Sequence, residues 1–397
     1  MHPTLVRAVK DLGYSAPTPV QAAAIPPALE GRDILASAAT GSGKSAAFGL
    51  PILNSLIGKK RGTTRALILV PTRELALQIT EHLRWLAKYN GDIKIAAILG
   101  GVGFRGQLDA FRRGSDIIVA TPGRLLDIMG QGLAKLETVD TLVLDEADRM
   151  LDMGFLPAVR KVVKALTGMR QTLLFSATIP PEIAKLTGEL LDDPVRVNLA
   201  PTSKPVDTVA QAVYTVPQER KTDLLVELLK DNNIFSAIVF TRTKARADRL
   251  AVALAKRDVL AERIHGDRSQ SQRTRALANF KRGKYRVLVA TDIAARGIDI
   301  EDLGHVVNYD VPAVPEDYVH RVGRTARAAK TGDAITFVSH EEERLFAQIE
   351  RSLGKRLDRS KMPELPPMAV PAFAARAPRQ NPRAPHIARA SYAKRKR

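Results

Sequence analysis

A glycine-rich segment near the amino end of the chain has the residue types and spacing of a phosphate-binding loop. After the apolar run Asp33–Ser37 comes Ala38-Ala39-Thr40-Gly41-Ser42-Gly43-Lys44-Ser45, and a helical pattern follows. Glycines let backbone N–H groups converge on phosphate oxygens, and the helix start adds its positive dipole end. We therefore expect Ala39 to Ser45 to bind nucleotide, with Lys44 on the β- and γ-phosphates and Ser45 on Mg²⁺. Ala38 replaces the usual first glycine, and a glycine-rich turn without chemistry is the alternative.

Three acidic residues supply the second element that nucleotide hydrolysis needs. Asp145-Glu146-Ala147-Asp148 directly follows the apolar run Thr141–Leu144. We expect Asp145 to hold Mg²⁺, through water, and Glu146 to orient or deprotonate the attacking water. A solvated acidic loop is the alternative, but a phosphate-binding pattern upstream favours chemistry. Together the two segments predict a domain that hydrolyses nucleoside triphosphates.

Short apolar runs that are covered by helical stretches must position these residues. Continuous apolar runs are typical of strands buried on both faces, and their alternation with helices predicts parallel sheets. The first set is Asp33–Ser37, Ala66–Val70, Ile93–Leu99, Asp116–Ala120, Thr141–Leu144, Thr172–Phe175 and Val195–Leu199, and the second is Ala210–Val216, Ala237–Phe240, Ala261–Ile264, Arg286–Ala290, His305–Asn308 and Ala334–Val338. We predict an α/β fold of two domains with mainly parallel sheets flanked by helices. Ligands of such sheets bind at the carboxyl ends of strands, where both chemical segments lie.

Composition predicts the boundaries of these domains. The first set of strands falls in residues 1–199 and the second in 209–355, and residues 200–208 read as a linker because they hold prolines and lack periodicity. Residues 356–397 contain eleven basic and two acidic residues among seven prolines. Proline opposes both helix and sheet, so we predict a disordered, Pro-rich basic tail.

The charge of the whole chain indicates its kind of partner. The 397 residues include 61 Lys+Arg against 42 Asp+Glu, a formal net charge of +19 at pH 7. Such an excess predicts a polyanionic partner, although basic residues that merely solubilise the surface are the alternative. The absence of cysteine excludes disulfide scaffolds, thiolate zinc sites and cysteine nucleophiles. Neither a membrane-length apolar run nor a secretory signal is evident, so we expect a cytoplasmic protein without membrane contact.

With its further motifs, the sequence resembles the DEAD-box RNA helicases. Asp145 to Asp148 spell the family's tetrad, and other blocks follow the family's order from Gly13 to Arg327. They are Gly13-Tyr14 with Pro17-Thr18-Pro19-Val20-Gln21, Pro71-Thr72-Arg73-Glu74-Leu75-Ala76, Gly100-Gly101, Thr121-Pro122-Gly123-Arg124, Ser176-Ala177-Thr178, Val239-Phe240-Thr241, Gln270-Ser271-Gln272-Arg273, Ala290 to Asp299 and His320 to Arg327. The pattern is most similar to the bacterial RhlE-type subgroup. The resemblance implies two RecA-like domains and an ATP-dependent enzyme acting on RNA.

The resemblance implies further residues that contact ATP. Tyr14 and Gln21 belong to the motif that reads adenine, and an amide can both donate to and accept from the adenine edge. Asp299 matches the family's ribose contact. Arg324 and Arg327 match arginines that reach the γ-phosphate, where planar guanidinium groups suit the charge on phosphoryl oxygens.

Other matched positions are expected to connect ATP hydrolysis with RNA. His320 matches a residue of the network around the cleft between the domains, and Ser176 and Thr178 match the motif that couples hydrolysis to RNA binding. Ser-Ala-Thr after a strand is otherwise a common helix cap. The positions that match RNA contacts are Thr72, Arg73, Gly101, Thr121, Arg124, Arg273 and Thr291, and Arg296 suits either RNA or ATP. Hydroxyls, backbone N–H groups and arginines suit phosphates and 2′-hydroxyls, so binding should be sequence-independent and salt-sensitive.

The implied mechanism is closure of two domains on ATP and RNA, local separation of short duplexes, and reopening after hydrolysis. An ATP-gated RNA clamp or scaffold without an unwinding role is the alternative, and the adenine motif and the tetrad disfavour a DNA translocase. Ribosomal or other RNP and RNA-degradation partners fit the resemblance, and we expect a monomer.

The sequence departs from the family pattern at three places. Family members carry an adenine-stacking aromatic residue upstream of the first motif, beyond where this chain starts, so we expect a raised KM for ATP. A misassigned or truncated start is the alternative. Ser45 replaces the more frequent Thr, and Ala326 the usual Gly. Both replacements are small, and we expect activity to be preserved.

Overall fold

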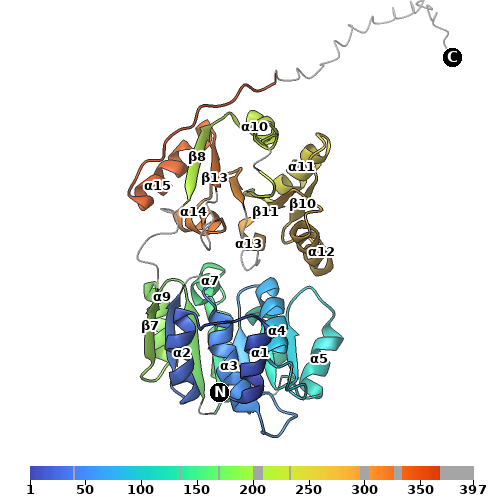
Figure 1. The fold of residues 1–397 in the computed structure, drawn as a ribbon, viewed down its shortest axis with the longest axis vertical. Helices are drawn as coiled ribbons and strands as arrows, with labels where there is room; N and C mark the ends of the chain where they lie inside the picture. The colour runs from blue at the N-terminus through green and yellow to red at the C-terminus, as the bar shows by residue number, and fades with distance from the viewer. Residues whose placement is uncertain are drawn as a thin grey trace, which may run out of the picture. The chain divides into compact units, whose positions relative to one another are not determined.

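The computed structural model contains two parallel β-sheets, each flanked by helices (Figure 1). The structure describes residues 1–38, 41–134, 136–168, 170–199, 209–231, 234–295, 304–325 and 333–366. Every apolar run predicted as a strand overlaps a strand of one of these sheets. The predicted linker, 200–208, lies outside the described residues.

The first sheet has seven strands in the order β3-β4-β2-β5-β6-β1-β7, and neighbouring strands pair in parallel. Its strands are β1 (Ile34–Ala38), β2 (Ala66–Leu69), β3 (Ile95–Ile98), β4 (Ile117–Ala120), β5 (Thr141–Leu144), β6 (Gln171–Ser176) and β7 (Val195–Leu199). The helices around it are α1 (Pro3–Asp11), α2 (Pro19–Leu29), α3 (Lys44–Leu56), α4 (Arg73–Leu86), α5 (Phe104–Arg112), α6 (Pro122–Met129), α7 (Ala147–Asp152), α8 (Leu156–Lys164) and α9 (Pro181–Leu190).

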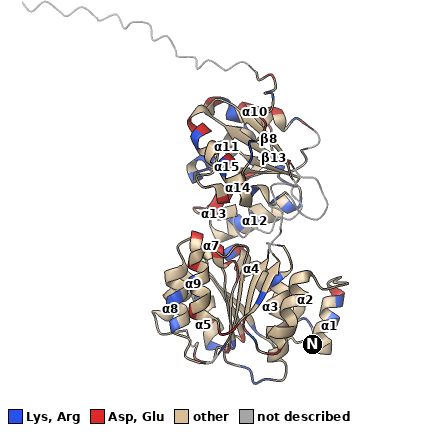
Figure 2. Cartoon of the chain, turned by 90° about the vertical axis from the view of Figure 1, so that its left-hand side faces the viewer, with Lys and Arg blue, Asp and Glu red and all other residues tan. Residues whose placement is uncertain are grey.

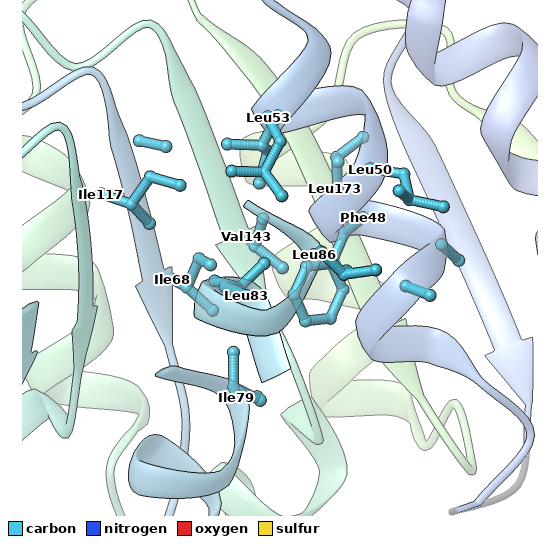
Figure 3. Packing of buried hydrophobic residues seen from close by; sticks show 14 of the residues in the cluster. Phe48, Leu50, Leu53, Ile68, Ile79, Leu83, Leu86, Ile117, Val143 and Leu173 are labelled. Carbon is cyan, nitrogen blue, oxygen red and sulfur yellow. The ribbon is translucent and has the colours of Figure 1, made fainter. Parts of the chain in front are cut away.

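Both faces of this sheet are buried because successive strand residues point to opposite faces and both sets are apolar. In β2, Ile68 packs with the cluster under α1 to α4, whereas Leu67 and Leu69 pack with the cluster under α5 to α9. Figure 3 shows the first cluster, in which Phe48 of α3 lies among side chains of α4 and the strands. The Phe48 ring also contacts Phe175 of β6, with centroids 5.4 Å apart.

The second sheet has six strands in the order β10-β11-β9-β12-β13-β8, again paired in parallel. They are β8 (Ala210–Thr215), β9 (Ala237–Phe240), β10 (Ala261–Ile264), β11 (Val287–Ala290), β12 (His305–Asn308) and β13 (Asp333–Val338). Around them are the helices α10 (Lys221–Leu228), α11 (Lys244–Ala255), α12 (Gln270–Lys281), α13 (Asp292–Ala295), α14 (Pro315–Val322) and α15 (Glu343–Leu353), with short 3₁₀ turns at Gln218–Arg220 and His340–Glu342. This architecture is the predicted α/β fold with two parallel-sheet domains.

The first residues of the predicted tail pack on the second sheet. Ser360 N donates to the Val213 carbonyl at 2.7 Å, and the Arg359 guanidinium lies 4.7 Å from the Phe346 ring centroid. The compact part of the chain extends to Pro363, eight residues beyond position 355, where composition placed the end of the second domain. Residues 367–397 lie outside the described part of the chain.

Charged residues occur on several of the helices that flank the sheets. Figure 2 shows Lys and Arg on α1 and α8, and acidic residues at α7, which follows β5. Across the described ranges, no helix combines the length and the apolarity of a membrane-spanning segment.

Candidate functional site

The phosphate-binding loop connects the end of β1 to the start of α3, as its sequence predicts. Gly41 and Gly43 have φ angles of 80° and 93°, in the left-handed region that favours glycine. Lys44 opens α3, is 6% exposed, and donates from Nζ to the Ala38 carbonyl at 3.0 Å. Ser45 follows as a half-buried residue of the first helical turn, and Ala39 and Thr40 lie outside the described residues. The loop therefore presents a buried ammonium group and a helix start at one strand end.

Gln21 is held against this loop. Its Oε1 accepts from Thr18 N at 3.0 Å in the capping box of α2, and its Nε2 donates to the Gly43 carbonyl at 3.1 Å. A Cβ on Gly43 would lie 2.5 Å from Gln21 Nε2, so only glycine fits this approach. Tyr14, the other predicted adenine contact, is 39% exposed and its hydroxyl lies 3.1 Å from His82 Nε2.

Asp145 and Glu146 follow β5 and are both buried, at 2% and 3% exposed. Burial raises the pKa of Asp145 to about 6 from its ordinary 3.8, and the charge of Lys44 opposes that rise. The charge of Lys44 is therefore near enough to Asp145 to act on its pKa. Glu146 has a φ of 54°, which is strained for a residue with a Cβ, and Arg149 Nη1 lies 2.6 Å from its carboxylate.

Asp148 connects the acidic segment to the predicted coupling motif. Its backbone N donates to Ser176 Oγ at 3.1 Å, and its Oδ2 accepts from Thr178 N and Thr178 Oγ1 at 2.9 and 3.1 Å. Ser176 is fully buried at the end of β6, next to Ser37 of β1 in the sheet register. Ser176 and Thr178 therefore have hydrogen-bond partners beside the nucleotide loop.

The predicted RNA contacts of the first domain follow β2, β3 and β4. Thr72 caps α4 by accepting from Leu75 N at 3.3 Å. The Arg73 guanidinium lies against Gly101, where an added Cβ would be 2.1 Å from Arg73 Nη1, and Gly101 has a φ of 78°. A glycine is therefore required for Arg73 to lie across this loop.

Arg124 and Thr121 lie at the start of α6. Thr121 is the N-terminal flanking residue of this helix and is 8% exposed. The Arg124 guanidinium lies 5.3 Å from the centroid of the Phe104 ring, and its Nη1 is buried without a hydrogen-bond partner in the described structure. An arginine held by stacking and left with an unused donor suits an anionic ligand.

In the second domain, Thr291 and Arg273 occupy the end of β11 and the first turns of α12. Thr291 is 8% exposed and follows β11 directly. Arg273 Nη2 lies 2.9 Å from Glu74 Oε2, and Gln270 Nε2 donates to Glu74 Oε1 at 2.8 Å. Burial lowers the pKa of Arg273, and Glu74 opposes that shift. Arg273 is thus paired with a carboxylate of the Pro71–Ala76 block.

The predicted γ-phosphate residues are described only in part. Arg324 is 7% exposed just after α14, and His320 is half-buried within that helix. Arg327, Asp299 and Arg296 lie outside the described residues.

Sequence reasoning missed two arginines that organise the motifs. Arg149 pairs with Glu146, and its position three residues later on α7 was the available signal. Arg321 is 2% exposed and binds both carboxylate oxygens of Asp292, at 2.6 and 2.7 Å, while its Nη1 donates to Asn308 Oδ1 at 3.1 Å. It lies inside the His320–Arg327 block, but a buried structural partner cannot be read from that block.

The order of the first sheet separates the predicted sites. The phosphate-binding loop, the acidic segment and Ser176 follow β1, β5 and β6, which are neighbours. Thr72, Gly100 and Thr121 follow β2, β3 and β4, which form the other part of the same edge. In the first domain, the loops that carry nucleotide-binding and RNA-binding candidates thus share one edge of the sheet without overlapping.

This fold and this site define a class of protein: a P-loop nucleotide hydrolase with paired parallel-sheet domains. Family models match the chain as DEAD/DEAH box helicase over residues 18–186 and as helicase conserved C-terminal domain over residues 220–329. The DEAD-box ATP-dependent RNA helicase CshA of Geobacillus kaustophilus is 42% identical over 361 residues, which are 91% of this chain and 77% of that protein. The protein of the same name in Bacillus subtilis is also 42% identical, over 91% of this chain and 73% of its own.

Solved structures agree with these matches. S. cerevisiae Dbp5 bound to RNA and ADP BeF3 superposes with a TM-score of 0.79 at 30% identity, covering 90% of this chain and 93% of that one. Mss116p bound to ssRNA and AMP-PNP gives 0.80 at 29% identity, covering 90% and 77%. The chain belongs to the DEAD-box ATP-dependent RNA helicases, a family of ATP-hydrolysing enzymes with RecA-like domains.

Proposed function

We propose that this helicase hydrolyses ATP at the β1–β5–β6 part of its first sheet edge and grips RNA at the β2–β3–β4 part. The observation that carries the proposal is the order of that sheet, which puts the two groups of candidate residues side by side without mixing them. Because the two groups extend from neighbouring strands of one sheet, with β2 paired to β5, a shift at one would be felt at the other. The bound state of the Dbp5 structure, with RNA and a nucleotide analogue together, supports the same pairing of ligands.

Three features of the nucleotide side fit ATP with Mg²⁺. Gly43 leaves a cradle that a Cβ would fill, and Lys44 Nζ donates to a neutral carbonyl, which a phosphate oxygen can replace. Asp145 carries a carboxyl whose pKa burial has raised, so a cation beside it would stabilise its charged form. Mg²⁺ keeps most of its waters and needs few protein ligands, which fits Ser45 and Asp145 as its holders. The ion would neutralise phosphate charge during hydrolysis.

The chemistry of the chain's own residues follows from their placement. The hydrogen bonds of Gln21 with Thr18 and Gly43 would orient its amide toward adenine, which Tyr14 would also contact. Glu146 would orient the attacking water once its carboxylate leaves Arg149.

The remaining assignments rest on the motif matches. Arg324 and Arg327 would act on the γ-phosphate, and Asp299 would contact the ribose. His320 would belong to the network around the cleft between the domains, and Arg296 would serve RNA or ATP. Thr72, Arg73, Gly101, Thr121, Arg124, Arg273 and Thr291 would hold the RNA backbone, and Ser176 and Thr178 would couple the two ligands. ATP-driven closure would then separate short duplexes locally or remodel RNPs.

We further propose a cytoplasmic monomer that works with ribosomal, other RNP or RNA-degradation assemblies. A cytoplasmic location would give the protein both RNA and ATP. The basic segment 367–397, which carries eight Lys and Arg and no acidic residue, favours RNA-containing partners. The RhlE-type subgroup is a proposal from the motif pattern, while the relatives reported above carry the name CshA.

ATP hydrolysis with single-stranded RNA, with single-stranded DNA and without nucleic acid tests the proposal. We expect RNA to stimulate the wild type far more than DNA does, and Glu146→Gln to lose turnover by a factor of about 100 or more. Glu182→Gln, an exposed glutamate in the first turn of α9, is the matched control and should turn over normally. Equal stimulation by DNA, or normal turnover of Glu146→Gln, would contradict it.

Strand separation distinguishes a helicase from an ATP-gated clamp. With a short RNA duplex, we expect wild type to release the labelled strand with ATP and Glu146→Gln to bind the duplex without multiple turnover. A wild-type chain that hydrolyses ATP and holds RNA but releases no strand would be a clamp.

A further inference from the structure

A pocket of about 500 Å³ opens on the second sheet, at the beginnings of β8, β12 and β13, and extends along β8 to Tyr214. Ala210, His305 and Asp333 line it, and each is the first residue of its strand, β8, β12 or β13. The motif residues Thr241 and Thr291 instead follow the carboxyl ends of β9 and β11. Because the strands run parallel, the strand beginnings and the motif residues lie at opposite edges of the sheet, about 13 Å apart along a four-residue strand such as β12.

The walls of the pocket combine apolar and acidic side chains. Tyr214, Leu228 and Ile335 are among its apolar residues, and the acidic residues Glu227, Asp231 and Asp333 also line it. No lysine or arginine is among the described residues that line it, although the chain carries +19. A site of this composition repels phosphates and attracts a cation that also has apolar surface.

The carboxylates of Glu227 and Asp333 are only lightly neutralised. Glu227 pairs with Lys230 at 2.6 Å, but that lysine side chain is 66% exposed and can swing away. Asp333 is 52% exposed and lies 3.4 Å from His305 Nε2. His305 itself is 9% exposed, and its Nδ1 has no hydrogen-bond partner in the described structure. A ligand can therefore engage these acids without breaking a buried ion pair.

An arginine holds one wall of the pocket in place. Arg286 Nε donates to the Ile234 carbonyl at 2.8 Å, and its Nη2 donates to the Asp231 carbonyl at 3.0 Å. Its backbone N donates to the Leu260 carbonyl at 2.8 Å. Ile234 and Asp231, which line the pocket, are thus tied to the strand beginnings, and a preorganised wall reduces the entropy cost of binding.

Exposed apolar residues extend the pocket into a docking surface. Phe235 follows Ile234 and is 81% exposed, and Leu260 is 65% exposed. Arg286 connects the two neighbourhoods through its bonds to Ile234 and Leu260. Large apolar side chains exposed beside a pocket indicate a surface that another protein covers.

We propose that this surface binds a segment of a partner protein in which arginine or lysine alternates with apolar residues. Apolar side chains would enter the pocket and cover Phe235, and the cations would pair with Glu227 and Asp333. Nucleic acid does not fit the acidic rim. Because the opposite edge of the sheet carries the motifs, the partner would bind while ATP and RNA remain bound.

Fluorescence anisotropy with the full chain tests this surface, using a short labelled peptide in which arginine alternates with leucine. Glu227→Lys and Phe235→Ala should each weaken binding about tenfold. The matched controls are Glu189→Lys, an exposed glutamate paired with Arg160 at 2.9 Å, and Trp85→Ala, an aromatic residue that is 52% exposed, and both should bind as wild type does. Saturating single-stranded RNA should leave peptide binding unchanged, and all four variants should keep RNA-stimulated ATP hydrolysis.

Several results would overturn the proposal. Equal affinity for a peptide with serine in place of leucine would show simple charge attraction, and equal weakening in the control variants would show a site elsewhere. Displacement of the peptide by RNA would place it on the RNA edge. A chain ending at Pro366 that binds the peptide much more tightly than the full chain would make residues 367–397, not a partner, the occupant.

Discussion

Replacing Asp145 by asparagine should make the ligand-free protein more stable at neutral pH while abolishing its activity. Burial raises the pKa of Asp145 to about 6, against an ordinary value of 3.8 that applies to the unfolded chain. The folded state therefore binds this proton more tightly than the unfolded state, and folding above pH 6 must bury a charge. The difference between the two pKa values corresponds to about 3 kcal/mol of folding free energy.

The sign of this effect fixes its pH dependence. The cost of burying the charged Asp145 carboxylate is fully present above pH 6 and shrinks between pH 6 and pH 3.8. It is absent below pH 3.8, where Asp145 is protonated in both the folded and the unfolded chain. Asparagine resembles the protonated carboxyl and can still accept from Glu146 N, as Asp145 Oδ1 does at 3.0 Å. At 2–4 °C per kcal/mol for a domain of this size, Asp145→Asn should raise the Tm of the first domain by about 6–12 °C at pH 8.

Thermal unfolding without nucleotide and with EDTA, followed from pH 4 to pH 8.5, measures this effect. Asp148→Asn is a matched control of opposite sign, because both carboxylate oxygens of Asp148 accept backbone hydrogen bonds, from Arg149 N at 3.0 Å and Thr178 N at 2.9 Å. An asparagine amide has only one oxygen that can accept, so one of these hydrogen bonds is lost and the free energy of unfolding of Asp148→Asn should fall by about 1–3 kcal/mol. An unchanged or lower Tm for Asp145→Asn at pH 8, or a gain independent of pH, would refute the reasoning.

Three further changes probe other parts of the molecule. Arg149→Met leaves the Glu146 carboxylate buried without its partner, so the free energy of unfolding measured with a denaturant should fall by about 3–5 kcal/mol. Adding Glu146→Gln to this variant should recover most of that loss. Gly43→Ala places a Cβ 2.5 Å from Gln21 Nε2 at a φ of 93°, so it should raise the KM for ATP more than it lowers kcat, and an unchanged KM would contradict the assigned role of Gln21. Deletion of 367–397 removes eight positive charges, so it should weaken RNA binding while saturated turnover is kept. The slope of log affinity against log salt concentration should become shallower by about 0.7 for each RNA phosphate that the shortened chain leaves unneutralised. Equal affinity of the two chains at all salt concentrations would show another role for the segment.

The strands and the place of the chemistry could be predicted because each depends on local sequence. A strand buried on both faces must be apolar throughout, and Ala66–Val70 satisfies this at every position. Loops that bind phosphate need glycine at fixed offsets, so Gly41 and Gly43 were visible without structure. Motif order then predicted that the loops would meet at the carboxyl ends of the strands.

Side-chain partners distant in sequence could not be predicted in the same way. Sequence spacing does not show that Gln21 bonds to Gly43, that Arg73 lies across Gly101, or that Arg321 binds Asp292. Composition also missed the packing of the first tail residues, because charge and proline content do not reveal that Arg359 stacks on Phe346.

The site combines several local costs that the surrounding sheet offsets. Glu146 adopts a left-handed backbone, which costs about 1–3 kcal/mol for a residue with a Cβ, and Asp145 carries a charge that burial disfavours. Both residues directly follow β5, a strand whose four residues are all buried and paired on both sides. The apolar packing of β5 holds the backbone of Asp145 and Glu146 in place. Without it, this backbone would move to relieve the strain at Glu146 and the buried charge at Asp145. The buried charge of Asp145 lowers the folding stability of the ligand-free enzyme. A ligand that brings positive charge to Asp145 would relieve this cost, and the relief would strengthen binding of that ligand.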